Sequence, residues 1–330
     1  MTTSTKEREF EMQTGPLRSE LLAHCYRMLG SAQEAEDQVQ ETYLRAWRAY
    51  HKFEGRSSIR TWMYRIATNT CLNALGSSAR RQLPTGLGQG PSDPSGALSS
   101  RPEVPWLEPL PEAMVGSAQP DPAPEEAVAT RGDVRLALIA ALQELPPRQR
   151  AVLVLRDVLG FSAEETGDVL DSTTASVNSA LQRARARMEE RGQTERARLA
   201  SELGPHEREL LQAYADAFER YDIDGLVDLL ATDATWEMPP FDGWYEGADA
   251  IMELIRTQCP ASGPGDMRMV PATANGQPAF ALYMRDPDGV HRAFQFAVLD
   301  VVDGRVRHVT AFFDRRVIAS AGLPNELPAT

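Results

Sequence analysis

The chain has 330 residues, 25% of them charged, and a formal net charge of −13. This length predicts two or three domains, each able to bury an apolar core. Its acidity argues against indiscriminate binding of nucleic acid, which is itself negatively charged. No apolar run is long enough for a spanning helix, and the N-terminus lacks the apolar stretch of a signal peptide. Cys25, Cys71 and Cys259 form neither a disulfide framework nor a metal pattern, so we expect free thiols in the cytoplasm.

Residues 16–80 are predicted to be helical. Ser31 and Glu34 have the spacing of a capping box, which begins a helix. Behind them apolar residues recur at helical spacing and form one apolar face of the predicted helix: Val39, Tyr43, Ala46, Trp47 and Tyr50. The other face is polar and holds Glu34, Asp37, Glu41 and Arg45.

Arginines and aromatic residues are interleaved between residues 51 and 81. The set consists of Arg56, Arg60, Trp62, Arg65, Asn69, Arg80 and Arg81, and we call it the strand-binding set. Cations that follow phosphates and rings that stack on unpaired bases suit single-stranded nucleic acid. Trp62 and Ile66 also have the spacing of core residues on a helix, and composition alone does not decide between the two interpretations.

Residues 82–130 differ in composition from both flanks. They hold ten prolines, five glycines and seven acidic residues against one base, Arg101, which disfavours helices and sheets. We therefore predict a Pro-rich acidic linker. The segment 104–110, VPWLEPL, is apolar enough to dock on a surface. The alternative is that it is a short apolar stretch within a disordered tether.

Residues 131–200 are again predicted to be helical. A second capping box, Ser162 to Glu165, opens a short helix, and a turn at 171–173 leads into another, which together indicate a helix-turn-helix. Val177, Leu181, Ala184 and Met188 share the inward face of the second helix. Its outward side chains could read base edges and phosphates. This recognition set comprises Thr174, Ser176, Asn178, Ser179, Gln182, Arg183 and Arg185.

Residues 206–318 predict an α+β domain, in which helices precede an antiparallel sheet. Hairpin turns are expected at 286–289 and 303–304. Aromatic and apolar residues could line a cavity for a small apolar ligand, or could simply be core. The candidate pocket set comprises Tyr214, Trp236, Met238, Trp244, Phe280 and Phe296.

These motifs resemble a known family. Residues 35–75 look like region 2 of bacterial extracytoplasmic-function sigma factors, and residues 142–188 look like their region 4. The C-terminal part resembles the SnoaL-like, cone-shaped fold shared with nuclear transport factor 2 and ketosteroid isomerase. The resemblance implies a multidomain chain with all-α region 2 at 10–81, the linker at 82–130, an all-α helix-turn-helix region 4 at 131–192 and a SnoaL-like regulatory domain at 206–318.

The resemblance also implies partners and roles for these residues. One set of residues would dock on the β′ clamp helices of core RNA polymerase. This polymerase-facing set consists of Asp37, Gln38, Glu41 and Arg45. The strand-binding set would capture the melted −10 promoter strand, with Trp62 opening the duplex and Asn69 near an extruded base. The recognition set would read the −35 element. The linker would thread polymerase channels normally lined for nucleic acid.

Other functions stay open at this point. Steroid-isomerase chemistry needs a carboxylate base and hydrogen-bond donors. By resemblance, the position of the base is occupied by Met238, and the position of one donor, a protonated acid, falls near Phe296. Of the groups that this chemistry needs, only the donor tyrosine has a counterpart, Tyr214. We therefore expect that the chain is not an enzyme and that it uses no cofactor and no metal. We expect the C-terminal domain to modulate transcription; alternatively, it senses a small ligand or is a vestigial enzyme. A plain helix-turn-helix regulator would not explain residues 53–81. The sequence does not decide whether a separate anti-sigma partner exists.

Overall fold

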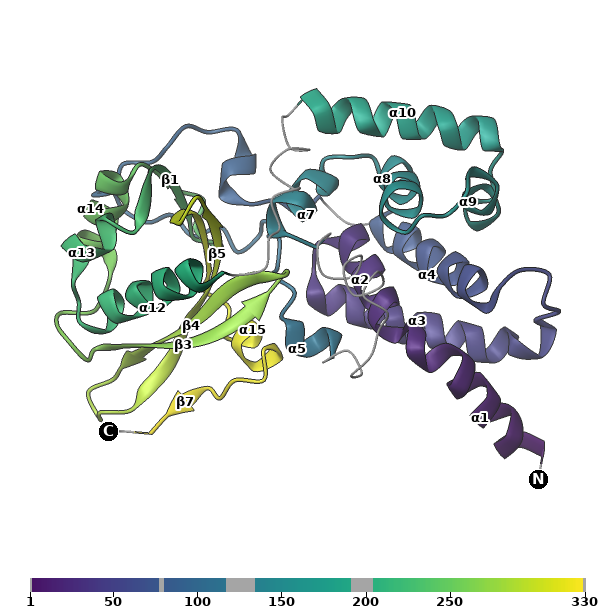
Figure 1. Cartoon of the computed structure of the whole chain (residues 1–330), viewed down its shortest axis with the longest axis horizontal. Helices are drawn as coiled ribbons and strands as arrows, with labels where there is room; N and C mark the ends of the chain where they lie inside the picture. The colour runs from purple at the N-terminus through teal and green to yellow at the C-terminus, as the bar shows by residue number, and fades with distance from the viewer. Residues whose placement is uncertain (1, 77–79, 117–133, 191–203, 329–330) are drawn as a thin grey trace. The chain divides into compact units, whose positions relative to one another are not determined.

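In a computed structural model of the chain, the structure describes residues 2–76, 80–116, 134–190 and 204–328 (Figure 1). They fall into two compact units. The helical unit is built from residues 1–81 and 115–198, and the α+β unit from residues 82–114 and 199–330. The chain thus leaves the helical unit once and returns to it.

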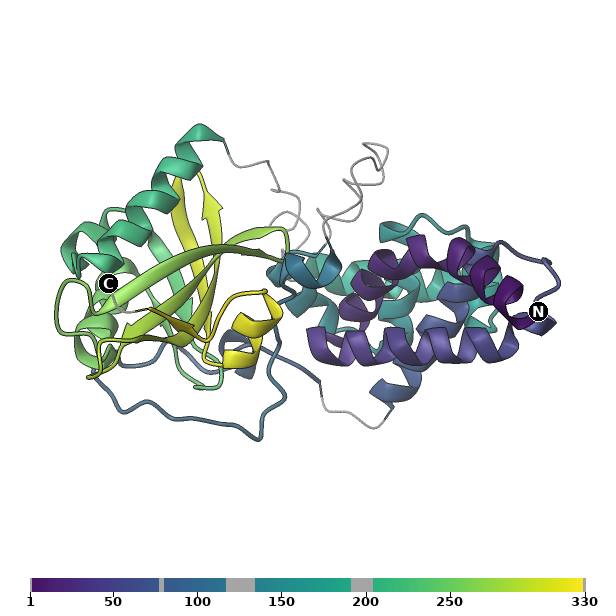
Figure 2. The same ribbon diagram turned by 90° about the horizontal axis from the view of Figure 1, so that it is seen from below.

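The helical unit contains two successive groups of helices, visible in both views (Figures 1 and 2). The first group is α1 (Thr2–Thr14), α2 (Arg18–Leu29), α3 (Ala32–Ala49) and α4 (Ile59–Leu75). The second group is α7 (Leu136–Gln143), α8 (Pro147–Leu153), the π-helical turn Val154–Val158, α9 (Ala163–Leu170) and α10 (Thr174–Glu190). Helix α2 lies at the centre, since every residue from Leu21 to Leu29 is buried.

Local sequence signals set the helix ends. Ser31 and Ser58 begin α3 and α4, and each side chain accepts a hydrogen bond from the backbone N–H three residues on. The predicted capping box at α9 is confirmed in both halves, between Ser162 and Glu165. At Gly167 a Cβ would lie 2.7 Å from the carbonyl oxygen of Ser172, so the tight turn after α9 requires glycine. The predicted helix-turn-helix is confirmed in α9 and α10.

A buried arginine joins the second group of helices to the first. Arg150 on α8 is 3% exposed and donates to the carbonyl oxygens of Gln143 (2.9 Å), Leu145 (3.2 Å) and Met28, the last at the end of α2. Gln143 also donates to the carbonyl of Arg27, at 3.3 Å. Burial lowers the pKa of Arg150 to about 10, so the guanidinium stays charged at neutral pH. The two groups therefore share one polar joint within one core.

The α+β unit has helices before and between the strands of one twisted sheet. The helices are α12 (Pro205–Glu219), α13 (Ile223–Val227), α14 (Ala248–Gln258) and α15 (Arg315–Ser320). The strands are β1 (Leu230–Glu237), β2 (Trp244–Glu246), β3 (Met267–Ala274), β4 (Gln277–Arg285), β5 (His291–Val302), β6 (Arg305–Phe312) and β7 (Glu326–Leu327). Their order is β2-β1-β6-β5-β4-β3, with β7 added beside β5. The pairing is antiparallel as predicted except between β1 and β6, which are parallel. The turns at 286–289 and 303–304 connect strands as expected.

The sheet has an inner face and an outer face, and each is buried. The inner face packs on α12 and α14 in a core that includes Tyr214, Trp236, Phe280 and Ala297. Across β4 and β5, Phe280 pairs with Ala297 and Ala281 with Phe296. Because side chains alternate along a strand, Phe296 points to the outer face. It is nevertheless fully buried, as are Leu107 and Ile318, so this face has its own apolar cover.

Residues 82–114 are packed on the α+β unit, and we call this segment the strap. Ser92 N–H donates to the carbonyl of Trp244 at 2.7 Å, and Arg101 N–H to that of Pro240 at 2.8 Å. Leu110 and Asn275 exchange two hydrogen bonds of 2.9 Å. Leu107 and Leu110 are 0% and 2% exposed. For residues 104–110 the docked alternative is therefore the observed one, and a disordered tether is wrong; residues 117–130 of the predicted linker lie outside the described residues.

Helix α1 was not anticipated, and it changes how α3 is buried. Phe10 on α1 packs edge-on against Trp47 and Tyr50, with ring centroids 5.4 and 5.1 Å away. Of the predicted apolar face of α3, Val39 and Ala46 are buried, but Trp47 remains 37% exposed. The apolar face is therefore buried along Val39 and Ala46, while Phe10 covers only part of the Trp47 indole.

A buried histidine makes the helical unit sensitive to acid. His24 on α2 is fully buried, its Nε2 lies 2.9 Å from Thr68 Oγ1, and burial beside Arg27 and Arg60 lowers its pKa to about 3 from 6.5. The unfolded chain therefore takes up a proton that the folded chain excludes, and stability falls as the pH drops from 6.5 toward 3.

We expect His24→Gln to keep a partner for Thr68 while removing this proton site. Between neutral pH and about pH 5, the free energy of unfolding should fall by about 2 kcal/mol less than in the wild type, since each pKa unit is worth about 1.4 kcal/mol. Urea unfolding, followed by hydrogen exchange in peptides from α2 and α4, measures the difference. Equal losses in both proteins would contradict this assignment.

Candidate nucleic-acid interface

Helix α4 and the loop before it carry most of the strand-binding set. Met63, Tyr64, Ala67 and Cys71 form the buried side of the helix. Trp62 and Asn69 are half-buried on the other side, about one turn and about three turns from the start of the helix. Trp62 stacks obliquely on Phe53, with ring centroids 4.9 Å apart, and lies 6.5 Å from Tyr50. The indole is therefore supported on one side by aromatic rings while part of its surface is accessible for stacking with a base.

The five arginines of the strand-binding set all form ion pairs with carboxylates of the helical unit. Within the first group of helices, Arg56 pairs with Glu54 at 2.5 Å, Arg60 with Glu20 at 3.2 Å and Arg81 with Glu34 at 2.7 Å. The other two pair with the second group: Arg80 with Glu144 at 2.7 Å, and Arg65 with Asp171. Sequence analysis did not anticipate these pairs, because four of the five carboxylates lie between 40 and 106 residues from their arginines.

Arg60 lies against two aromatic rings. Its guanidinium lies 5.0 Å from the ring centroids of both Tyr64 and Phe161, and these two rings meet edge-on at 5.3 Å. Glu20 accepts hydrogen bonds from Arg60 and from the hydroxyl of Tyr64, each at 3.2 Å. Burial and the Glu20 carboxylate raise the pKa of Tyr64, so its hydroxyl remains a donor. This cluster links α4 to the loop before α9.

Helix α10 presents the recognition set to solvent. The inward residues Val177, Leu181, Ala184 and Met188 are at most 8% exposed, which confirms the predicted buried face. Every member of the recognition set is exposed. Arg185 differs from the others because it donates to both oxygens of Asp157, at 2.8 and 2.6 Å. A guanidinium held in this bidentate pair is less available to DNA than Gln182 or Arg183.

The polymerase-facing set lies on α3. Asp37 and Arg45 are exposed, Gln38 and Glu41 are half-buried, and Arg45 pairs with Glu41 at 2.6 Å. Beside them is a groove of about 530 Å³ between α1 and α3, whose wall includes Phe10, Leu44 and Trp47. Leu44 is 51% exposed, which makes this surface apolar as well as charged. Sequence analysis missed the apolar part, because Leu44 lies outside the helical pattern that defined the face.

The candidate pocket set of the α+β unit does not surround a single cavity. Tyr214, Trp236, Met238 and Phe280 are buried together on the inner face, with Tyr214 stacked 5.9 Å from Phe280. Phe296 lies on the outer face, and Trp244 is half-buried with its indole N–H donating to the carbonyl of Gln89 in the strap, at 3.0 Å. These two placements correct the prediction of one shared pocket, because strand alternation and the strap separate the residues.

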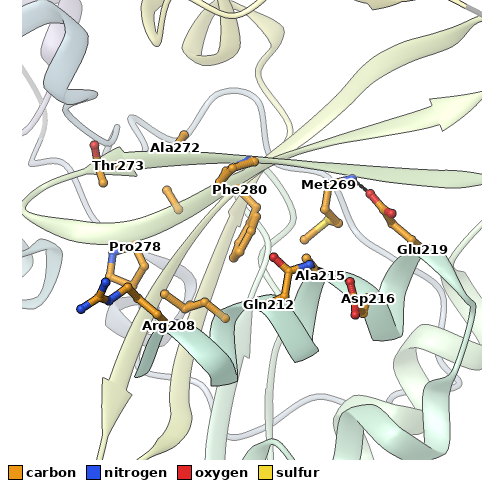
Figure 3. A pocket seen from close by; sticks show the side chains of 13 residues that line it. Arg208, Gln212, Ala215, Asp216, Glu219, Met269, Ala272, Thr273, Pro278 and Phe280 are labelled. Carbon is orange, nitrogen blue, oxygen red and sulfur yellow. Dashed lines mark hydrogen bonds between the residues drawn. The ribbon is translucent and has the colours of Figure 1, made fainter. Parts of the chain in front are cut away.

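A groove of about 430 Å³ lies at the flank of this unit, between α12 and strands β3 and β4 (Figure 3). Phe280 is the member of the pocket set that lines it, and α12 contributes Arg208, Gln212 and Asp216. Glu219 closes one end by accepting a hydrogen bond of 2.9 Å from the backbone N–H of Met269. The groove is thus separate from the surroundings of Trp236, whose buried indole N–H has no hydrogen-bond partner among the described residues.

One buried carboxylate of the α+β unit is fixed by the strap. Glu237 is fully buried on the outer face, opposite to its neighbour Trp236. It accepts from the N–H and hydroxyl of Thr85, at 3.1 and 3.0 Å, and lies 2.8 Å from Nε2 of His308. The hydroxyl of Thr310 is 3.4 Å away. This carboxylate is committed to structure and faces away from Tyr214, so it cannot act as a base at the inner face.

Within the described ranges, no three His, Cys, Asp or Glu side chains are grouped so that they could hold a metal ion. Of the helices that the structure describes, none combines the length and the apolar character needed to cross a membrane.

Three family models match the chain in the order of these elements. Residues 16–81 match Sigma-70 region 2, residues 135–188 match Sigma-70, region 4, and residues 211–309 match the SnoaL-like domain. The first match covers α2 to α4, the second covers α7 to α10, and the third runs from within α12 into β6.

Similar proteins share this organisation. The chain is 54% identical over 320 residues to the ECF RNA polymerase sigma factor SigG of Mycobacterium tuberculosis, covering 97% of this chain and 85% of that protein. It is 28% identical over 257 residues to the ECF RNA polymerase sigma factor SigJ of the same organism, covering 76% and 73%. The crystal structure of the Mycobacterium tuberculosis extracytoplasmic function sigma factor SigJ superposes with a TM-score of 0.58 at 22% identity, over 93% of this chain and 98% of that one, which shows a shared fold.

We expect Glu237→Gln to loosen the strap. An amide cannot accept from Thr85 and His308 as a carboxylate does, and hydrogen bonds to a charged group contribute roughly 1.5–3 kcal/mol. Amide hydrogen exchange over residues 82–90 should accelerate at least about tenfold, the equivalent of 1.4 kcal/mol. Asp233→Asn is the matched control, because it removes an exposed partner of Arg307 from the same sheet. Exchange in Glu237→Gln at the control rate would show that this carboxylate does not anchor the strap.

Proposed function

Because the chain belongs to the family of extracytoplasmic-function (ECF) RNA polymerase sigma factors, we propose that it binds core RNA polymerase and directs initiation at its own class of promoters. The observation that carries the proposal is the presence, in one chain, of two different DNA-facing elements. Helix α10 exposes side chains suited to duplex DNA, and α4 supports a half-exposed tryptophan suited to unpaired bases. A plain transcription regulator binds duplex DNA and needs only an element such as α10; it does not need an element that binds unpaired bases.

We propose that α3 is the surface for core polymerase. The polymerase-facing set supplies charge, and the neighbouring groove supplies apolar area through Leu44 and Trp47. Interfaces of this kind combine an apolar centre with a polar rim. Leu44 and Trp47 belong to one apolar patch at this groove, together with Phe10 and Tyr43, and a contiguous exposed apolar patch marks a site of protein association.

For the −10 strand, we assign Trp62 to stacking and Asn69 to hydrogen bonding with a base. The arginines of the strand-binding set would follow phosphates once their present carboxylate partners are replaced. For the −35 element, Asn178 and Gln182 have the donor and acceptor pairs that read adenine edges, and Arg183 suits guanine or phosphate. Thr174, Ser176 and Ser179 are placed for phosphate contacts. Arg185 contributes less, because Asp157 holds it.

We assign the α+β unit a regulatory role without catalysis. The strap that connects region 2 to the rest of the helical unit is packed on this unit, with Thr85 fixed on Glu237 and Trp244 bonded to Gln89. Any path of the strap through polymerase requires these contacts to be exchanged for others. The domain can therefore set how readily the strap is released. Acting with RNA polymerase places the protein in the cytoplasm.

Run-off transcription tests the proposal. Purified full-length chain and a second form ending at Glu190 are added to bacterial core polymerase on a library of promoter fragments. Initiation that depends on the chain supports a sigma factor, and a change of output in the shorter form supports regulation by the α+β unit. Folded protein that binds core polymerase but initiates on none of the fragments contradicts the proposed function.

The recognition helix gives a sharper expectation. Gln182→Ala should lower initiation at the preferred promoters by about 5- to 150-fold, since a good base contact is worth roughly 1–3 kcal/mol. It should lower initiation less at fragments altered at the base that Gln182 reads. Gln212→Ala, on α12 of the α+β unit, is the control of the same residue type. A uniform loss across all fragments would show that Gln182 does not read sequence.

A further inference from the structure

One carboxylate of region 4 is bound to an arginine of the recognition set. Asp157 lies in the π-helical turn Val154–Val158 after α8, and accepts hydrogen bonds from Nε and Nη2 of Arg185, at 2.8 and 2.6 Å. The turn is closed by a hydrogen bond of 3.0 Å from the N–H of Leu159 to the carbonyl of Val154. Insertions of this kind in a helix are frequent at functional sites. Sequence analysis did not identify Asp157, because nothing local indicates a partner 28 residues away.

Arg185 belongs to the stripe of α10 that would read bases. Asn178, Gln182 and Arg185 are spaced by four and three residues, so the three side chains lie on one face of the helix. At a rise of 1.5 Å per residue, Arg185 lies about 4.5 Å beyond Gln182 along the helix axis. A long side chain at this place can reach the phosphates that border the groove in which Gln182 would lie. The carboxylate of Asp157 holds the guanidinium away from them.

The Asp157–Arg185 pair contributes little to the fold. The two side chains are 30% and 55% exposed, and an ion pair at this exposure adds little to stability. Helix α10 is held instead by its buried stripe, in which Val177 and Ala184 are 1% and 0% exposed. The larger effect of Asp157 is on the charge that α10 presents to DNA, because the carboxylate occupies donors that would otherwise bind phosphate oxygens.

A phosphate contact from Arg185 would be indifferent to sequence. Contacts with phosphates position a protein on DNA, whereas contacts with base edges distinguish one sequence from another. An added phosphate contact would therefore tighten binding to every promoter fragment alike. At a fixed concentration of polymerase, preferred fragments approach saturation and gain little, while poorly matched fragments gain in full. The difference in occupancy between them becomes smaller.

We infer that Asp157 is a specificity-determining residue of region 4, which keeps Arg185 from the DNA backbone so that recognition of the −35 element depends on the base-reading side chains of α10. The inference rests on the proposed function of α10. Because both partners belong to region 4, the pair does not depend on how region 4 lies relative to the rest of the chain. It also presents no net charge to DNA, so loss of Arg185 alone would leave a carboxylate beside phosphates.

The test measures initiation by core polymerase with the full-length chain, on preferred promoter fragments and on fragments altered in the −35 element. The polymerase complex is kept at the concentration that half-saturates the preferred fragments. Asp157→Asn should raise initiation on the altered fragments about eightfold at about 0.1 M salt, because the gain from one phosphate contact scales as about the −0.9 power of salt concentration. Preferred fragments should gain at most about twofold, since half of them are already occupied.

Two further variants assign the gain to the release of Arg185. Arg185→Gln should lower initiation on every fragment, because Asp157 is left unpaired, and adding Asp157→Asn to it should restore the wild-type output. Asp168→Asn is the matched control, since it removes one exposed carboxylate of α9 in the same helix-turn-helix, and it should leave discrimination as in the wild type. A thermal melt verifies that each variant is folded.

Several results overturn the inference. A merely structural pair would make Asp157→Asn and Arg185→Gln lose output alike. A phosphate contact already made by Arg185 in the wild type would leave the double variant as weak as Arg185→Gln. A gain of equal size in Asp168→Asn would show a general effect of charge, and unchanged discrimination by a folded Asp157→Asn would show that the pair has no effect on DNA.

The wild-type chain separates this inference from the proposed function. Initiation by the wild type without a gain in Asp157→Asn overturns the inference and leaves the sigma function standing. Where the wild type initiates on no fragment, the sigma function is contradicted, and binding of a fluorescein-labelled 20-base-pair duplex to the full-length chain at about 50 mM salt decides the inference. A gain with Asp157→Asn that Arg185→Gln removes supports it, and equal binding by wild type and Asp157→Asn overturns it.

Discussion

The helical unit depends on the buried guanidinium of Arg150. It donates to carbonyl oxygens at the ends of α2 and α7, and in this way joins two groups of helices that the chain separates by a long excursion. A cation at this depth is tolerated because backbone oxygens surround it. Removing it would leave several buried carbonyls without a donor. Through this joint the second group of helices comes to lie against α4, and the ion pairs Arg65–Asp171 and Arg80–Glu144 become possible.

Local structure could be predicted from sequence, since its causes are local. Capping at Ser31, Ser58 and Ser162, the buried stripe of α10 and the turn at 303–304 all depend on residues within a few positions of each other. Long-range contacts could not be predicted in this way. Nothing near Arg65 in the sequence indicates that it pairs with Asp171. The proline content of the strap predicted an irregular linker, but the strap is ordered by hydrogen bonds to Trp244 and Asn275 and has no long regular element of its own.

The candidate sites divide in the same way. The recognition set was placed correctly on an exposed face because helical spacing defines that face, although Arg185 is held by Asp157. The pocket set was split because strand alternation sends Phe296 and Phe280 to opposite faces, a difference that depends on register. Sequence analysis did not identify Glu237 as a buried carboxylate. Its partners, Thr85 and His308, lie far from it in the sequence, so nothing local indicates them.

The central claim is that α4 and Trp62 hold melted promoter DNA when the chain is bound to core polymerase. Permanganate footprinting measures this directly, because permanganate modifies thymines that are unpaired and unstacked. On a promoter that the chain serves, thymines near the −10 element should become reactive only when both the chain and core polymerase are present. Trp62→Ala should abolish that reactivity while binding to core polymerase persists. Full reactivity with Trp62→Ala, or a duplex that stays closed with the wild type bound, would contradict the account.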